Sequence, residues 1–103
     1  MTTITSDNPS EYSIIRCDRS GVFFGIIESL EGQKATIRNC QNIHYWDGAA
    51  SVMQLATEGV KAPENCRFTV IVDKLVVLDV IQIIPCTPDA ERNLRAVKIW
   101  RRD

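Results

Sequence analysis

The sequence lacks most of the residues from which catalytic and metal-binding sites are built. Its 103 residues include a single histidine, His44, so a Ser-His-Asp or Cys-His site would have to be built around that one side chain. His, Asp and Glu residues nowhere cluster at metal-ligand spacing, and the five glycines form no phosphate-binding loop. These shortages predict that the protein is not an enzyme and that it carries no cofactor and no metal.

The cysteines are not paired along the sequence. Cys17, Cys40, Cys66 and Cys86 lie far apart, and no two of them form a Cys-x-x-Cys motif. Zinc fingers and ribbons need closely spaced pairs of ligands. In the absence of a secretion signal, separated cysteines are typical of reduced, half-buried residues in a cytosolic protein.

A large net charge, a signal peptide and a membrane-spanning run are absent as well. The 12 basic and 13 acidic residues leave a formal net charge of −1, which draws the protein neither to nucleic acid nor to a membrane. Residues 1–10 have neither the basic nor the apolar region of a signal peptide. The longest apolar tract, residues 68–85, is interrupted by Asp73, Lys74 and Asp79. We therefore expect a cytoplasmic protein without a membrane partner. Nucleic-acid binding through the basic C-terminal residues Arg92, Arg95, Lys98, Arg101 and Arg102 is a less favoured alternative, because the whole chain is slightly acidic.

What the sequence does contain is enough apolar residues for one small core. Its 45% hydrophobic content excludes disorder for most of the chain. A chain of this length forms one domain, whose modest stability is commonly supplemented by oligomerisation. We expect a flexible N-terminal arm over residues 1–11 and a single α+β domain over residues 12–103.

Apolar residues alternating between turn signals predict about six short strands, mostly antiparallel. The expected strands are 12–17, 22–28, 34–40 with an extension or restart at 43–45, 66–72, 75–84 and 96–100. Gly25 indicates a bulge or a close backbone approach. Residues 75–84 are nearly continuous in apolar side chains, which predicts a central strand, and residues 96–100 are expected as an edge strand.

A first short helix is predicted after the aromatic pair Tyr45-Trp46. Asp47 is the expected N-cap, because its carboxylate can accept from the free N–H groups of the first turn. Gly59 is the expected end, because glycine takes positive φ at low cost. The predicted buried stripe consists of Ala49, Val52, Met53, Ala56 and Val60, at helical spacing.

A second short helix is predicted near the C-terminus. Thr87 is its expected N-cap and Pro88 its first residue, and the helix should run to about Leu94 or Arg95. The fold class is therefore α+β: a small, mostly antiparallel sheet of about six strands with two short helices.

Aromatic residues supply the first candidates for ligand binding. Tyr45 and Trp46 lie where a strand meets a helix, so their rings can stack on a base or anchor a partner. The alternative is that one or both cover the core. Phe23 and Phe24 are adjacent in a strand and should point to opposite faces, which predicts that one of them lies on the outer face or in an interface. We include Phe24 among the candidates.

Arginines supply the second group of candidates. Arg92 and Arg95 are three residues apart, so they are neighbours on one face of the second helix. Arginine side chains in that arrangement can hold a phosphate group through paired hydrogen bonds. The alternative is a solvated basic face.

Several local patterns resemble a family of small proteins encoded by tailed phages and prophages. The resemblance covers about residues 12–100 and is carried by Tyr45-Trp46-Asp47-Gly48-Ala49 with Ser51, Leu55-Ala56, Glu58-Gly59, Asn65-Cys66, Ile83-Ile84-Pro85-Cys86-Thr87, Val97 and Trp100. Many members of this family have no assigned role.

The same set is similar to the first Thoeris anti-defence family, phage proteins that sequester cyclic ADP-ribose immune signals. That resemblance implies a homo-oligomer that holds a cyclic ADP-ribose isomer, or a cyclic oligonucleotide, without cleaving it. No ligand residues are carried over from that family, so Tyr45, Trp46, Phe24, Arg92 and Arg95 remain candidates on their own chemistry. The alternative function is a phage protein-interaction module, either an assembly factor or an inhibitor of a host protein, which needs only exposed aromatics and free strand edges.

Overall fold

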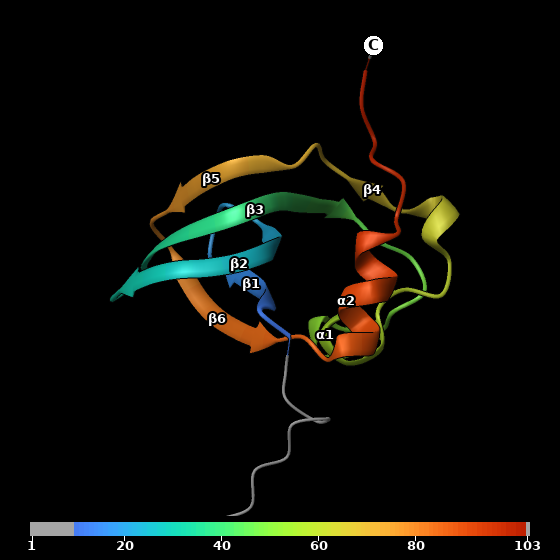
Figure 1. Cartoon of the computed structure of the whole chain (residues 1–103), viewed down its shortest axis with the longest axis horizontal. Coiled ribbons are helices and arrows are strands. Elements are labelled where there is room, and N and C mark those ends of the chain that lie inside the picture. Colours follow the sequence, from blue (N-terminus) through green and yellow to red (C-terminus); the bar gives the residue numbers. More distant parts are fainter. Residues whose placement is uncertain (1–9, 103) are drawn as a thin grey trace, which may run out of the picture.

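The computed structural model describes residues 10–102, which form six strands and two helices (Figure 1). The elements are β1 (Tyr12–Cys17), β2 (Val22–Glu31), β3 (Lys34–Tyr45), α1 (Val52–Glu58), a 3₁₀ turn η1 (Pro63–Asn65), β4 (Arg67–Phe68), β5 (Val72–Val77), β6 (Val80–Pro85) and α2 (Pro88–Arg95). Every pairing between the six strands is antiparallel. The predicted α+β class is therefore confirmed.

The sheet curls so strongly that its two edge strands approach each other. β3 pairs with β2 along one side, and with β4 and β5 along the other; β2 pairs with β1, and β1 with β6. β5 and β6 are thus opposite edges of the sheet, yet only residues 78–79 separate them along the chain. The N–H of Val80 donates to the carbonyl of Gln33 over 2.9 Å, which ties this turn to the β2–β3 turn.

Side chains from five strands pack together on the inner face of this curl. They are Ile15, Cys17, Phe23, Ala35, Ile37, Cys40, Val77 and Val80. Gly25 lies on the same face, where an added Cβ would come within 2.6 Å of the Ile37 side chain. The register of β2 and β3 also shifts between Phe24 and Ile26. The close approach and the irregularity predicted at Gly25 are both confirmed.

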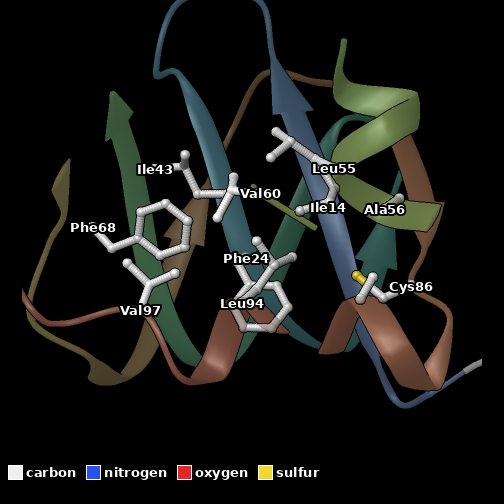
Figure 2. Packing of buried hydrophobic residues seen from close by; sticks show 11 residues of the cluster. Ile14, Phe24, Ile43, Leu55, Ala56, Val60, Phe68, Cys86, Leu94 and Val97 are labelled. Carbon is white, nitrogen blue, oxygen red and sulfur yellow. The ribbon is translucent and has the colours of Figure 1, made fainter. Parts of the chain in front are cut away.

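The opposite face of the sheet is covered by the two helices (Figure 2). Ile14 from β1 and Phe24 from β2 meet Leu55 of α1 and Leu94 of α2 there, and all four are at most 1% exposed. Because both faces of β2 are covered, Phe23 and Phe24 are both buried. The prediction that one of these rings lies on the outer face or in an interface was therefore wrong.

The first helix is shorter than predicted and has a different cap. Ser51 is the N-cap: its backbone is extended and its hydroxyl accepts from the N–H of Gln54 over 3.2 Å. Asp47 instead accepts a hydrogen bond from the Asn65 amide over 3.0 Å. Met53, expected in the buried stripe, is 52% exposed. Gly59 ends the helix at φ 79°, as predicted.

The second helix follows its local signals closely. Thr87 caps it through a hydroxyl that accepts from the N–H of Ala90, and Pro88 stands in its first turn. The helix ends at Arg95, as expected. Its buried residues are Ala90 and Leu94, which face the sheet.

The second half of the sheet differs from the prediction. Asp73 and Lys74 separate the predicted strands 66–72 and 75–84 and were thus expected to join them, but they lie within β5, and the turn is at residues 78–79. The predicted central strand over 75–84 is therefore split into parts of two edge strands. The physical reason is the Asp79 side chain, which accepts from the N–H groups of Arg19 and Ser20 and so holds the turn against the β1–β2 turn. Residues 96–100 form no full strand; Ile99 makes a single parallel bridge to Phe68.

The N-terminal arm predicted over residues 1–11 lies outside the described residues except for Ser10 and Glu11. The N–H of Ser10 donates to the carbonyl of Cys86 over 2.9 Å, which joins the chain to the end of β6. Within residues 10–102, no helix has both the length and the apolar character needed to cross a lipid bilayer.

Candidate functional site

A hollow with convergent aromatic and charged groups lies beside Trp100. This Trp100 cleft has a volume of about 810 Å³ and is lined by His44, Tyr45, Asp47, Glu64, Asn65, Cys66, Arg67 and Trp100. The lining residues come from the end of β3 and the loop that follows it, from the stretch that runs from η1 to β4, and from the C-terminal segment. Ligand pockets commonly fall in this range of volumes.

Backbone pairing brings these three segments together. Tyr45 of β3 is paired with Arg67 of β4. The N–H of Trp100 donates to the carbonyl of Phe68 over 2.8 Å, on the other side of β4. Phe68 is fully buried, so the short strand β4 is anchored in the core and carries the cleft residues on either side of it.

Two aromatic rings and one cationic group meet in the lining of the cleft. The rings of His44 and Trp100 are stacked with centroids 5.2 Å apart and an interplanar angle of 12°. The guanidinium carbon of Arg67 lies 5.5 Å from the centroid of the Trp100 ring, a cation–π distance. Trp100 is nevertheless 47% exposed, so much of its surface remains available to a ligand.

A second hollow adjoins the first along Trp100. It measures about 580 Å³ and is lined by Thr69, Val70, Trp100, Arg101 and Arg102. Trp100 therefore forms a wall shared by both hollows, and the arginines of the C-terminal segment follow directly after it. This arrangement places an aromatic platform beside cationic groups, the combination used to bind bases together with phosphates.

The lining of the Trp100 cleft also includes two acidic residues, Asp47 and Glu64, and Asp47 is held by hydrogen bonds. Asp47 accepts from Asn65, and its own N–H donates to the Cys66 sulfur over 3.4 Å. Burial raises the pKa of the Cys66 thiol above its usual range, although the hydrogen bond with the Asp47 backbone opposes this. Cys66 therefore contributes a protonated thiol at neutral pH rather than a nucleophilic thiolate.

The two aromatic candidates at the strand–helix junction have different environments. Tyr45 is 52% exposed and lines the Trp100 cleft. Trp46 is half-buried, packs against the core under the helices, and donates its indole N–H to the carbonyl of Ala49 over 3.2 Å. Tyr45 is thus placed to meet a ligand, whereas Trp46 closes the loop that leads into α1.

The remaining candidates lie around a different, smaller hollow. This Tyr12 pocket measures about 280 Å³ and is lined by Tyr12, Phe24, Asn39, Gln41, Ile71 and Arg95. The Tyr12 ring stacks on Phe24 with centroids 4.7 Å apart, and the Arg95 guanidinium carbon lies 5.3 Å from its centroid. Phe24 is 1% exposed and forms the floor.

Both helical arginines already have acidic partners. Arg95 pairs with Glu91 over 3.1 Å, and Arg92 pairs with Asp89. Arg92 and Arg95 share a shallow surface with Glu91 and Ala96, away from the lining of the Trp100 cleft. The structure therefore separates the arginine candidates from Tyr45.

The buried cysteines have raised pKa values and low reactivity. Burial raises the pKa of Cys40 and of Cys86 to about 12. Burial and the neighbouring Asp79 carboxylate raise the pKa of Cys17 to about 11. These thiols stay protonated at neutral pH and are poor nucleophiles. Among residues 10–102, no three His, Cys, Asp or Glu side chains gather closely enough to hold a metal ion.

Trp100 and Arg67 were not among the residues selected from the sequence, and His44 was considered only for catalysis. The signal that could have found them is composition: two tryptophans and one histidine in a short chain, with arginines on both sides. Their joint site depends on pairing between β3, β4 and the C-terminal segment. His44 and Trp100 are more than 50 residues apart in the sequence, so no local pattern connects them.

The chain belongs to the family described as a domain of unknown function, DUF6948, whose model matches residues 10–94. No curated protein and no solved structure matches the chain. The family match covers β1 to α2 and stops before Trp100.

Proposed function

We propose that the protein binds a nucleotide-class small molecule at the Trp100 cleft and holds it without cleaving it. More specifically, we propose that the ligand is a cyclic nucleotide immune signal, such as a cyclic ADP-ribose isomer. The protein would then be a phage anti-defence protein that sequesters this signal. The observation that supports this proposal is the cluster of His44, Trp100 and Arg67, with Arg101 and Arg102 beside it.

The chemistry of the cleft matches the two halves of a nucleotide. A base is held by stacking on an aromatic ring, and the energy of that contact is nearly independent of base identity. Phosphate oxygens are held by guanidinium groups, which donate paired hydrogen bonds. Arg67 lies close to the Trp100 ring, so one small molecule can contact both groups at once.

Holding without cleavage agrees with the groups present in the cleft. Hydrolysis of a phosphodiester or glycosidic bond needs an activated nucleophile or a positioned acid–base pair. The Cys66 thiol has a raised pKa, and Asp47 is engaged by Asn65. Binding energy in such a site favours retention of the ligand rather than its reaction.

The test is a calorimetric titration of the whole chain with cyclic ADP-ribose isomers and with cyclic dinucleotides. Trp100→Leu should weaken binding by roughly 5-fold to 150-fold, the loss of about 1–3 kcal/mol expected for one stacked base. Arg67→Ala should weaken it by about tenfold. The matched control is Arg92→Ala, which removes an equal charge outside the cleft and should leave affinity within about twofold.

Mass spectrometry of the ligand released by heating checks the second half of the proposal. An intact ligand supports sequestration, whereas a cleaved one shows catalysis and contradicts it. Failure of every cyclic nucleotide to bind would overturn the proposal. Circular dichroism of each variant shows that a lost affinity does not reflect a lost fold.

A second candidate function is a protein-interaction module. The observation that favours it is the run of exposed aliphatic residues between Val70 and Ile81. Capture of one host protein by the wild-type chain, lost in a charged variant of this run, would support it. Full small-molecule affinity with no captured protein would count against it.

A further inference from the structure

Exposed aliphatic side chains are concentrated on and beside β5. The set, called here the aliphatic edge, consists of Val70, Ile71, Val72, Val76 and Leu78, each between 39% and 69% exposed. Single exposed apolar residues are ordinary, but five within nine positions form a patch of the kind that marks an interaction surface.

The free edge of β5 lies along this patch. Within the part of the chain that the structure describes, residues 10–102, β5 pairs only with β3. Figure 1 shows β5 as the outermost strand along the top of the molecule. The equivalent edge of β4 is occupied, because the Trp100 N–H donates to Phe68 and Ile99 bridges to the same residue. The unpaired edge therefore begins after β4 and extends along β5, where its N–H and C=O groups can pair with another strand.

The lysine in the middle of β5 is directed away from the free edge. A lysine in the middle of an edge strand commonly keeps other strands away. Here the Lys74 ammonium group lies 3.4 Å from Glu28, and Arg38 approaches the same carboxylate at 3.9 Å. Glu28 is on β2, two strands inward, so Lys74 reaches across its own sheet rather than over the free edge.

We propose that β5 pairs antiparallel with β5 of a second copy of this chain, about a two-fold axis at Leu75. This inference does not depend on ligand binding at the Trp100 cleft. Such an interface is isologous: the same residues contribute from both subunits, and the two curled sheets become continuous across it.

The side-chain pattern selects this register. When the two-fold axis is perpendicular to the sheet, the side chains of two opposing residues point to the same face. Because side chains alternate along a strand, the residue numbers of an opposing pair are both odd or both even. An axis at Asp73 would place two aspartates opposite each other, and an axis at Lys74 would do the same with two lysines. An axis farther along would shorten the ladder. The axis at Leu75 avoids both clashes and uses the whole of β5, residues 72–77, together with Leu78, the first residue of the turn that follows.

In this register the exposed face of the edge becomes self-complementary. Val72 lies opposite Leu78 of the partner subunit, and Lys74 lies opposite Val76 of the partner subunit. Each contact occurs twice because of the symmetry. The aliphatic stem of Lys74 covers the valine while its ammonium group remains with Glu28.

The register can be tested with two variants that place opposite charges at position 76. Val76→Lys places a second lysine opposite Lys74 of the partner subunit at two sites, whereas Val76→Glu places an opposite charge there. We expect the dimer of Val76→Lys to dissociate at least about tenfold more readily than that of Val76→Glu, measured by sedimentation equilibrium. Met53→Lys is the matched control, because Met53 is equally exposed, at 52%, and lies on α1. It should dimerise like the wild type.

Cross-linking tests the register independently. In the double variant Val72→Cys with Leu78→Cys, opposing Cα atoms fall within disulfide range, and mild oxidation should give a covalent dimer. Val72→Cys alone should give almost none. A mass of 11.6 kDa at all concentrations, equal dissociation of the two Val76 variants, or equal cross-linking of the single and double variants would overturn the proposal. Capture of a different protein by the same edge in a monomeric chain would also overturn it.

Discussion

Asn93 connects the two helices, and its replacement should destabilise the fold measurably. Its side-chain oxygen accepts from the Val60 N–H over 2.8 Å, and its amide nitrogen donates to the Val60 carbonyl over 2.9 Å. Val60 follows the end of α1 and is 2% exposed, and in the described residues 10–102 Asn93 is the partner of both its backbone groups. Asn93→Ala leaves both backbone groups without their partner.

The expected cost follows from those two groups. A buried polar group that loses its partner costs about 1–3 kcal/mol. Asn93 is half-buried, so water can partly reach the two Val60 groups when the amide is removed. We therefore expect Asn93→Ala to lower the free energy of unfolding by about 2–4 kcal/mol. In a domain of this size, that lowers the melting temperature by on the order of 10–20 °C.

Asn93→Asp tests the geometry more sharply. The carboxylate keeps the acceptor for the Val60 N–H but turns a second oxygen toward the Val60 carbonyl, so it should be destabilising at pH 7. Such a carboxyl group binds its proton more tightly in the folded state than in the unfolded state. The destabilisation is therefore present above the folded-state pKa and decreases as pH falls through it, because the protonated oxygen donates again.

The assay is urea unfolding followed by tryptophan fluorescence at pH 7 and pH 4. The neighbouring Arg92→Ala is the control: it removes an exposed pair with Asp89 and should change stability by no more than about 0.5 kcal/mol. The reasoning is refuted if Asn93→Ala is as stable as this control, or if Asn93→Asp loses no stability at pH 7 relative to the wild type.

Three further predictions concern the turns and the thiols. Gly59→Ala should cost about 3 kcal/mol, because this position has φ 79° and ψ −152° and an added Cβ would lie 2.2 Å from Asn93; Gly32→Ala, at φ 59° with nothing within 4 Å, should cost only about 1 kcal/mol in the same urea titration. The Ser20 hydroxyl and the Arg19 N–H hold the pKa of Asp79 below its ordinary value of 3.8. Its contribution to stability is therefore present above pH 3.8 and is lost as pH falls through the lower folded-state pKa; Asp79→Asn should flatten the pH dependence of the urea midpoint between pH 2 and 5, and an unchanged slope would contradict this. Thiol titration of the native protein at pH 8 should modify half-buried Cys66 first, since the pKa values of Cys40 and Cys86 are raised to about 12; rapid reaction of either buried thiol would contradict their placement.

Local signals were sufficient where the deciding interactions are close along the chain. β1 begins and ends as predicted, at Tyr12 and Cys17. The start of α2 was predicted from Thr87 and Pro88 because a cap and the N–H group it accepts from are only three residues apart. The same rule failed at α1, where Asp47 and Ser51 are both suitable caps. Only the distant Asn65, which engages Asp47, decides between them.

Long-range contacts decided the sheet and the site. The turn at residues 78–79 depends on Asp79 reaching the backbone of Arg19 and Ser20, which are 60 and 59 residues away. The burial of both Phe23 and Phe24 requires that the sheet curl and that helices cover its other face. No alternation pattern along one strand contains that information.

The sequence by itself determined the α+β class, the first strand, the second helix and the shortage of catalytic and metal-ligating residues. These follow from composition, periodicity and caps, which act within a few residues. Only the tertiary structure brought His44, Arg67 and Trp100 into one cleft, separated Arg92 and Arg95 from Tyr45, and left β5 as a free edge. The physical reason is that backbone pairing between distant segments, rather than local propensity, sets which side chains become neighbours and which edge remains unpaired.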